Sequence, residues 1–235
     1  MNERMLAWRA SAKADRITFT LTALAIGAAV AYLLLLGARP YPGDVALKTS
    51  MCAILATLAW RERERLLCVG LLFSAAGDAF LAVDGERLFV PGLASFLITH
   101  VLYAVLFVRR ARTMPAPLSA PRKLALISIA VFAVSFAIVL WPSLGGLTVP
   151  VAVYMLAIVT MALTSLRIPV WLAPAGAALF VVSDSLIALG KFLWDAPWMA
   201  PAIWITYAAA QVALVHGCLR SRPARPSVRT SRTSG

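Results

Sequence analysis

Apolar runs of helical length recur along this chain from Ile17 almost to Arg220. Each run is close to the ~20 residues that an α-helix needs to cross the hydrocarbon core of a bilayer. Of the 235 residues, 61% are hydrophobic and only 14% are charged. A soluble domain of this composition would lack the polar surface to cover its core. The sequence therefore predicts an integral membrane protein.

The runs predict an all-α fold, a polytopic membrane bundle with eight transmembrane helices. They are continuous and rich in Leu and Ala, without the two-residue alternation of a membrane β-barrel. No small-residue cleavage site follows a short hydrophobic core, so a secretory signal peptide is not expected. The expected spans, of which the second is the shortest, are residues 17–37, 45–60, 66–83, 88–108, 123–141, 147–166, 169–189 and 199–219.

The basic residues alternate from one connecting segment to the next, and this alternation explains the net charge of +12. If the N-terminus is cytoplasmic, the outer segments hold only four of the 22 Lys and Arg residues, namely Arg39, Lys48, Arg87 and Lys191. The positive-inside rule therefore places both termini in the cytoplasm and supports an even number of spans. We expect a cell (inner or plasma) membrane location, with the lipid bilayer and no nucleic acid as partner.

Three regions are expected along the chain. Residues 1–16 form a basic cytoplasmic N-terminus, residues 17–219 form the membrane domain, and residues 220–235 form a basic cytoplasmic tail. The tail is low in complexity, which predicts disorder. No sequence feature indicates an oligomeric state.

Two acids lie inside apolar runs: Asp78 in "LLFSAAGDAFLAV" and Asp184 in "LFVVSDSLIAL". An ionisable side chain at the centre of a membrane helix costs at least ~2.5 kcal/mol and is usually functional or paired. Counting 1.5 Å per residue places Asp78 about 18 Å and Asp184 about 22 Å from the inner ends of their helices. Both acids are therefore expected in the outer half of the membrane, with Tyr154 at a compatible depth.

Other polar residues share helix faces with one another or with these acids. In the fourth span, a single stripe contains Gly92, Phe96, His100, Tyr103 and Phe107. Ser74 lies four residues before Asp78, Ser183 adjoins Asp184, and Gln211 lies four residues after Tyr207. The alternative to a functional role is structural, because such serines, glutamines and tyrosines also form hydrogen bonds between membrane helices.

Two converging aspartates would form a general acid and general base pair. Their mutual repulsion and dry surroundings favour a protonated form of one acid near neutral pH, while the other is ionised. The sequence does not predict a metal site, because it has one deep His, His100, and no HxxH or HxxxH spacing. No metal and no cofactor are therefore expected.

The polar stretches also resemble a known family. In chain order they are "KTS" at Lys48, "FSAAGDAFLAV", "FVPGLASFLITHVLY", "VAVYMLAIVTM", "AGAALFVVSDSLIALGKF" and "YAAAQVALVHG". Together they resemble the YhhN family of eight-helix integral membrane proteins, whose eukaryotic members are lysoplasmalogenases. The chain departs from the family pattern at Thr49, where the family commonly has Pro.

This resemblance implies hydrolysis of the vinyl ether bond of a lysoplasmalogen, an alkenyl glycerophosphocholine or glycerophosphoethanolamine. The products are a fatty aldehyde and a glycerophospho-alcohol. The reaction requires an acid that protonates the β-carbon and an anion that stabilises the resulting oxocarbenium ion. The expected catalytic residues are Asp78, Asp184, His100, Tyr103 and Tyr154, and the expected substrate-binding residues are Lys48, Ser74, Ser183 and Gln211.

In this interpretation, one aspartate is the acid, the other stabilises the cation, and Lys48 meets the phosphate of the lysophospholipid. A cavity among the third, fourth, sixth and seventh helices would admit the lipid sideways from the bilayer. The alternative function is a proton-coupled transporter of a small molecule or lipid, because paired membrane carboxylates also serve as proton relays.

Overall fold

The computed structural model describes residues 3–84 and 86–222, with side chains from residue 15 onward. All regular elements in these ranges are helices, which confirms the predicted all-α class. The α-helices are α1 (Glu3–Leu35), α2 (Asp44–Arg61), α3 (Arg65–Val83), α4 (Phe89–Thr113), α5 (Ala120–Leu140), α6 (Thr148–Ser165), α7 (Leu172–Phe192) and α8 (Met199–Arg220). The connections contain three short 3-10 helices, η1 (Leu36–Ala38), η2 (Trp141–Ser143) and η3 (Gly145–Leu147).

Seven of these α-helices are long and apolar enough to cross a membrane, as expected for a multi-pass membrane protein. The exception is α2, which has Asp44, Lys48 and Arg61 within its 18 residues. Each expected span coincides with one helix, but α1 already begins at Glu3, so most of the predicted N-terminal region continues the first helix. Of the predicted tail, residues 223–235 lie outside the described residues.

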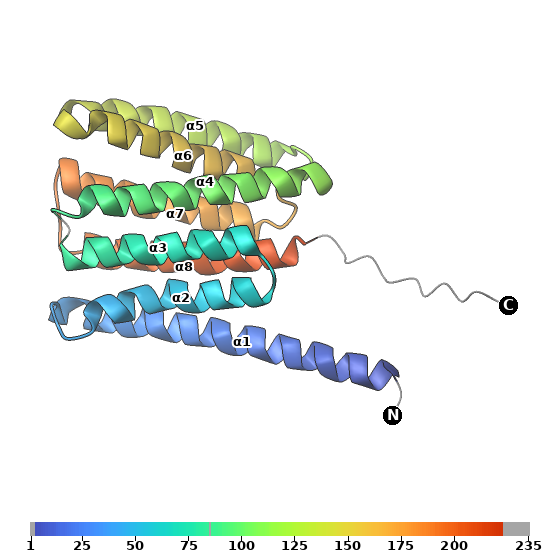
Figure 1. Ribbon diagram of the computed structural model, residues 1–235. Coiled ribbons are helices and arrows are strands. Elements are labelled where there is room, and N and C mark those ends of the chain that lie inside the picture. Colours follow the sequence, from blue (N-terminus) through green and yellow to red (C-terminus); the bar gives the residue numbers. More distant parts are fainter. Residues whose placement is uncertain (1–2, 85, 223–235) are drawn as a thin grey trace.

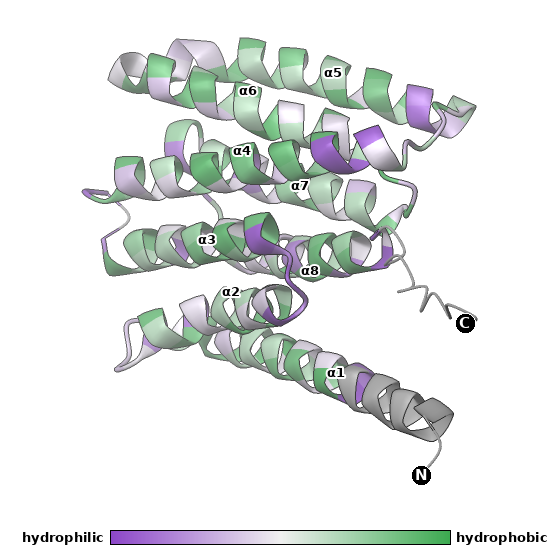
Figure 2. Ribbon diagram, turned by 45° about the vertical axis from the view of Figure 1, so that its right-hand side comes forward, coloured by the Kyte–Doolittle hydropathy of each residue, from purple (hydrophilic) through white to green (hydrophobic). Residues whose placement is uncertain are grey.

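The helices run side by side along a common direction (Figure 1). One edge of the bundle consists of α1 and α2 and the other of α5 and α6, with α3, α4, α7 and α8 between them. The beginning of α1 and the end of α8 lie at the same end, which we call the proximal end; the opposite end is the distal end. The middle parts of the helices are mostly hydrophobic, and the most hydrophilic segments lie toward the ends (Figure 2).

Two glycines allow α3 and α4 to approach closely in the middle of the bundle. A Cβ atom on Gly70 would lie 2.5 Å from Cε1 of Tyr103, and one on Gly77 would lie 2.6 Å from Cε2 of Phe96. Small residues at membrane helix interfaces permit this kind of approach. The rings of α4 therefore pack directly on the backbone of α3, which fixes the position of Asp78 beside Gly77.

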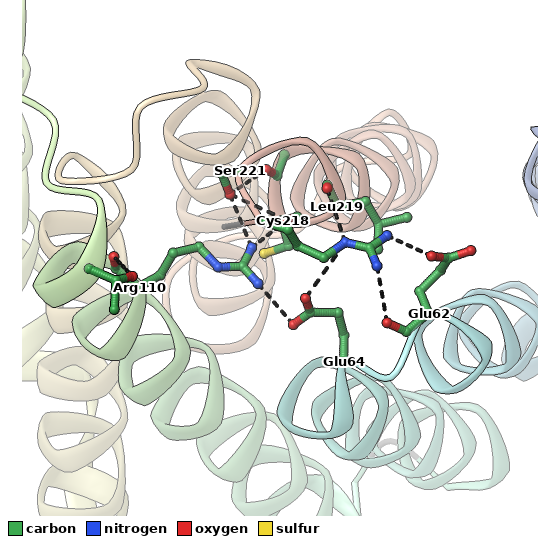
Figure 3. A network of polar contacts seen from close by, with 9 residues as sticks. Glu62, Glu64, Arg110, Cys218, Leu219 and Ser221 are labelled. Carbon is green, nitrogen blue, oxygen red and sulfur yellow. Dashed lines mark hydrogen bonds and ion pairs between the residues drawn. The ribbon is translucent and has the colours of Figure 1, made fainter. Parts of the chain in front are cut away.

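Charged side chains connect several helices at the proximal end (Figure 3). The buried Arg110 of α4 donates hydrogen bonds to Oε2 of Glu64 at 2.8 Å and to Oγ of Ser221 at 3.0 Å. Arg222 donates to Oε2 of Glu62 at 2.7 Å. These bonds hold the α2–α3 turn against the ends of α4 and α8.

In contrast, α5 is held mainly at its beginning. Arg122 donates to the carbonyls of Ile168 at 2.8 Å and Pro169 at 3.0 Å, and its guanidinium carbon lies 4.5 Å from the ring centre of Trp171. Only Arg122 and Leu140 of α5 are buried. Because packing contacts drive helix association in a bilayer, α5 is less firmly bound along its length than the central helices.

Candidate active site

Three helices bring a carboxyl, an imidazole and a phenol together, and we call Asp184, His100 and Tyr154 the Asp184 cluster. Oη of Tyr154 in α6 donates a hydrogen bond to Oδ2 of Asp184 in α7. Nε2 of His100 in α4 lies 3.2 Å from the same oxygen and 2.9 Å from Oη of Tyr154. Both contacts use Oδ2, so Oδ1 is the oxygen of Asp184 that is available to a further partner.

Aromatic rings fix the orientation of His100, which is fully buried. The centroid of its ring lies 5.2 Å from that of Tyr154 and 4.7 Å from that of Phe180, both edge to face. Among the described residues, Nδ1 has no hydrogen-bond partner. His100 can therefore change its tautomer without breaking a protein hydrogen bond at Nδ1.

The other membrane acid belongs to a second group, which we call the Asp78 cluster: Asp78, Lys48, Cys52 and Tyr207. Oη of Tyr207 in α8 donates to Oδ2 of Asp78 at 2.7 Å. Nζ of Lys48 in α2 lies 3.8 Å from Oδ1 of Asp78, and Sγ of Cys52 lies 3.1 Å from Oη of Tyr207. Both carboxyl oxygens of Asp78 therefore have partners inside the bundle.

Two phenylalanines lie between the clusters. The ring of Phe180 packs against His100 at 4.7 Å and against Tyr207 at 5.4 Å, while Phe96 lies 5.8 Å from Tyr207. Among the described residues, no hydrogen bond or ion pair joins Asp78 to Asp184. The two acids therefore have separate hydrogen-bond partners, and their joint action as an acid and base pair stays a prediction.

A third polar group joins α3, α4 and α8 and includes three of the residues expected at the site. Oη of Tyr103 donates to Oε1 of Gln211 at 3.0 Å, and Nε2 of Gln211 donates to Oγ of Ser74 at 2.9 Å. Ser74 donates to Thr99 at 3.2 Å, and Thr99 donates to the carbonyl of Gly70 at 2.9 Å. The structure therefore places Tyr103, Ser74 and Gln211 in an interhelical network, which is the structural alternative that the sequence left open.

Two further residues expected to bind substrate also have protein partners. Lys48 was expected to stand at the outer mouth of its helix, but its side chain is only 14% exposed and is paired with Asp78. Oγ of Ser183 donates to the carbonyl of Ile203 at 3.1 Å, which connects α7 to α8. Lys48 is thus covered by neighbouring helices, and Ser183 makes the kind of interhelical hydrogen bond that the sequence left open as its alternative role.

An apolar cavity adjoins the Asp184 cluster and has a volume of about 70 Å³. Its polar wall includes Asp184, Tyr154 and Ser185, and the remaining lining is aliphatic and aromatic. The expected helices α3, α4, α6 and α7 all contribute, and α5 adds a further wall that includes Phe132 and Phe136. The role of α5 could not be anticipated, because no ionisable group inside this span indicated which of its faces looks inward.

The sequence indicates only in part the contacts of Tyr207, Cys52 and Thr99, which the structure places among the polar groups of the bundle. The spacing of Tyr207 and Gln211 indicated a shared face, but not that Tyr207 bonds Asp78. Cys52 gives no functional signal in the sequence, because no cysteine has metal-ligand spacing and a cysteine in an apolar run is typical of a small buried residue. Thr99 carried no signal, because a threonine in a membrane helix commonly bonds its own backbone.

Comparison with known proteins identifies relatives of the chain. The sequence model of the YhhN family matches residues 43–218, a range that includes every member of both clusters. The chain is 37% identical over 182 residues to a lysoplasmalogenase of Mycobacterium bovis, covering 73% of this chain and 69% of the relative. It is also similar to lysoplasmalogenase TMEM86A of Bos taurus (37% identity) and of Homo sapiens (36%), each covering 66% of this chain and 65% of the relative. No solved structure matches. On this sequence similarity and the extent of the family match, the chain belongs to the YhhN family.

Proposed function

We propose that the protein is a lysoplasmalogenase-type hydrolase that cleaves the vinyl ether bond of a lysoplasmalogen. The observation that carries this proposal is the position of Asp184, bonded by Tyr154 and His100, in the wall of an otherwise apolar cavity. The names of relatives at 36 and 37% identity support hydrolysis over the alternative of a proton-coupled carrier. The products are a fatty aldehyde and a glycerophospho-alcohol.

In the proposed mechanism, Asp184 supplies the proton. Protonated Asp184 donates from Oδ1 to the β-carbon of the vinyl ether, which produces an oxocarbenium ion beside the new carboxylate. Tyr154 and His100 stabilise this carboxylate by hydrogen bonds to Oδ2. The carboxylate then takes a proton from the water that attacks the cation, which restores the acid and gives a hemiacetal. Collapse of the hemiacetal releases the aldehyde and the alcohol, so one water is consumed in each turnover.

We assign Asp78 a positioning role in place of the acid or cation-stabilising role expected from the sequence. Lys48 offsets its charge and Tyr207 occupies Oδ2, while Phe96 and Phe180 lie between it and the Asp184 cluster. The Asp78 cluster holds α2, α3 and α8 together. It thereby supports the aromatic layer against which His100 packs.

Access of the substrate requires the cavity to widen. A volume of about 70 Å³ accommodates a few water molecules, whereas pockets for drug-sized ligands are typically ~300 to 1,000 Å³. The wall with the fewest buried residues is α5, which is anchored at Arg122. We propose that the alkenyl chain enters from the bilayer by displacing α5, with Phe132 and Phe136 moving with it.

We further propose that all eight α-helices span the membrane and that the proximal end is cytoplasmic. α2 is 18 residues long and packs between α1 and α3, so its charged residues lie at its two ends or, for Lys48, against Asp78. The proximal end carries most of the basic residues of the connecting segments, as the positive-inside rule requires of a cytoplasmic face.

The direct test is an assay of the purified protein with an alkenyl glycerophosphocholine and an alkenyl glycerophosphoethanolamine, in which aldehyde release is followed. We expect aldehyde from both lipids and none from the corresponding saturated alkyl ethers, because protonation requires the double bond. Proton-dependent uptake into vesicles without aldehyde would support the carrier and reject the hydrolase.

A further inference from the structure

Lys191 lies on the same face of α7 as Asp184, seven residues further toward the distal end. Seven residues are close to two helical turns, which corresponds to a rise of about 10.5 Å. Ala188 occupies the turn between them and lines the cavity. The helix therefore aligns the proposed acid, the cavity wall and an ammonium group along one line.

The side chain of Lys191 lies over an aromatic residue that lines the cavity. Its Nζ lies 5.2 Å from the ring centre of Phe89, which packs edge to face against Phe192 at 6.0 Å. Both phenylalanines line the cavity. The ammonium group thus lies beside an aromatic residue that lines the cavity containing Asp184.

The present partner of Lys191 is readily exchangeable. Nζ lies 2.6 Å from Oε2 of Glu86, whose side chain is 84% exposed, while that of Lys191 is 22% exposed. An ion pair with such an exposed partner contributes little stability, because water and salt screen it. An anionic oxygen of a ligand can therefore replace Glu86 with little loss of free energy, because it forms a charge-assisted hydrogen bond with Lys191.

We propose that Lys191 binds the headgroup phosphate of the lysolipid whose vinyl ether is presented to Asp184, an inference that rests on the proposed function. Seven bonds separate the β-carbon of the vinyl ether from the phosphorus atom. An extended chain advances about 1.2 Å per bond, so these atoms lie about 8 Å apart. With a contact distance of about 3 Å at each end, the span is about 14 Å, which the ~10.5 Å rise between the two residues covers once the length of the extended lysine side chain is added.

The geometry favours Lys191 over Lys48, the lysine that the sequence suggested for this role. Lys48 is paired with Asp78, and Phe96 and Phe180 lie between that pair and the Asp184 cluster. Lys191, in contrast, lies over the ring of Phe89, which lines the cavity. The headgroup would accordingly lie at the distal end, with the alkenyl chain directed toward the middle of the bundle.

The test compares Lys191→Gln and Lys191→Arg with the unaltered protein on two substrates. These are an alkenyl glycerophosphocholine and the corresponding 1-alkenylglycerol, which lacks the phosphate. Lys191→Gln should raise KM for the phospholipid about tenfold or more, as expected for loss of a hydrogen bond to a charged group, and should change KM for the alkenylglycerol less than about twofold. kcat should stay within about twofold on both substrates, and Lys191→Arg should restore the KM.

Arg87→Gln is the matched control, because Arg87 is a basic residue at the same end whose side chain is 89% exposed. Equal effects of Lys191→Gln on the KM of both substrates, or no effect on either, would overturn the phosphate site.

A binding assay with 1-alkyl glycerophosphocholine tests the phosphate site independently of hydrolysis, because this ether has no vinyl bond. If the unaltered protein binds this ether in a Lys191-dependent manner but releases no aldehyde from vinyl ethers, the phosphate site stands and the hydrolase is rejected. If Lys191→Gln and the unaltered protein bind the alkyl ether with the same affinity, the phosphate site is rejected, whatever the hydrolytic activity of either protein.

Discussion

Nζ of Lys48 lies 3.8 Å from Oδ1 of Asp78 inside the bundle, with the two side chains 14% and 4% exposed. Asp184 has a different environment: its contacts are the phenol of Tyr154 and the imidazole of His100, and it lines a cavity. One membrane acid is thus matched by a lysine, and the other faces space that a ligand can occupy. The two acids should therefore respond differently to the same substitution.

Asp184→Asn should abolish most aldehyde release while the protein stays folded. Asparagine still accepts hydrogen bonds from Tyr154 and His100, but it cannot donate a proton to carbon. General acid catalysis typically contributes a factor of ~10² to 10⁴, so kcat should fall at least about 100-fold. Steady-state kinetics in detergent, together with a thermal unfolding curve, measure both quantities. Wild-type turnover in this variant would rule out Asp184 as the acid.

Asp78→Asn should instead act mainly on stability, because it leaves the ammonium of Lys48 buried without its counter-charge. Breaking a buried ion pair by removing one partner costs about 3 kcal/mol or more. The folded fraction should keep a kcat within about tenfold of the unaltered protein. The double variant Lys48→Gln with Asp78→Asn should regain most of the lost stability. If Asp78→Asn is as stable as the unaltered protein but has lost turnover, Asp78 and not Asp184 would be the acid.

Tyr154→Phe removes one donor to Asp184 and leaves the ring in place. The carboxylate that forms after proton transfer then loses one of its two hydrogen bonds, so kcat should fall about 10- to 100-fold with KM nearly unchanged. Tyr207→Phe is the matched control, because it removes the donor to Asp78 in the same way. Equal losses of kcat in both variants would contradict the different roles assigned to the two clusters.

Ala188→Phe should block the cavity. Ala188 lines it one turn beyond Asp184, and a phenyl ring there competes with the alkenyl chain for the available volume. kcat/KM for a long-chain substrate should fall at least about tenfold, which corresponds to ~1.4 kcal/mol. Val182→Phe, at a position on α7 that is 45% exposed, serves as the control and should retain activity. Comparable losses in both variants would argue against this cavity as the substrate site.

Gly77→Ala should destabilise the fold by about 1 to 3 kcal/mol, the usual cost of overpacking. The added methyl would lie 2.6 Å from the ring of Phe96, which packs against Phe180 and Tyr207 between the clusters. Gly27→Ala is the control, since its Cβ would meet no atom within 4 Å and alanine is the better helix former. Thermal unfolding should separate the two variants, and equal midpoints would contradict the tight α3–α4 contact.

Cysteine labelling can test the proposed topology, because the native Cys52, Cys68 and Cys218 are all buried. Ser143 lies exposed at the distal end and Ser119 lies exposed before α5 at the proximal end. A membrane-impermeant maleimide should modify Ser143→Cys in intact cells, and Ser119→Cys only after permeabilisation. The reverse pattern would show that the orientation is inverted. Labelling of both positions in intact cells would show that α5 does not cross the membrane and would contradict the even number of spans.

The sequence predicted the helices well, because long apolar runs have one dominant solution in a bilayer. It also selected Asp184, His100 and Tyr154, which the structure brings into contact. It did not predict which partners each acid has, since the direction of a side chain around its helix depends on packing against distant helices. The ring of Phe180 between the clusters is one such tertiary feature.

Lys48 illustrates the same limit for charged residues. Its place near the start of an apolar run suggested a free ammonium at the membrane surface. In the structure, Lys48 lies one helical turn inside α2 and reaches a carboxyl on the neighbouring helix. A one-dimensional pattern cannot distinguish these cases, because the partner is 30 residues away along the chain.

The position of α8 has a consequence for biosynthesis. This helix supplies Tyr207 to Asp78 and Gln211 to Tyr103 and Ser74, although the ribosome makes it after α1 to α7. While α8 is still being synthesised, these buried groups on α3 and α4 have no such partners within the lipid, where unpaired polar groups are costly. The nascent chain is therefore a substrate for membrane quality control until α8 inserts. A truncation that removes α8 should accordingly lead to degradation of the protein and not to a stable product with α1 to α7.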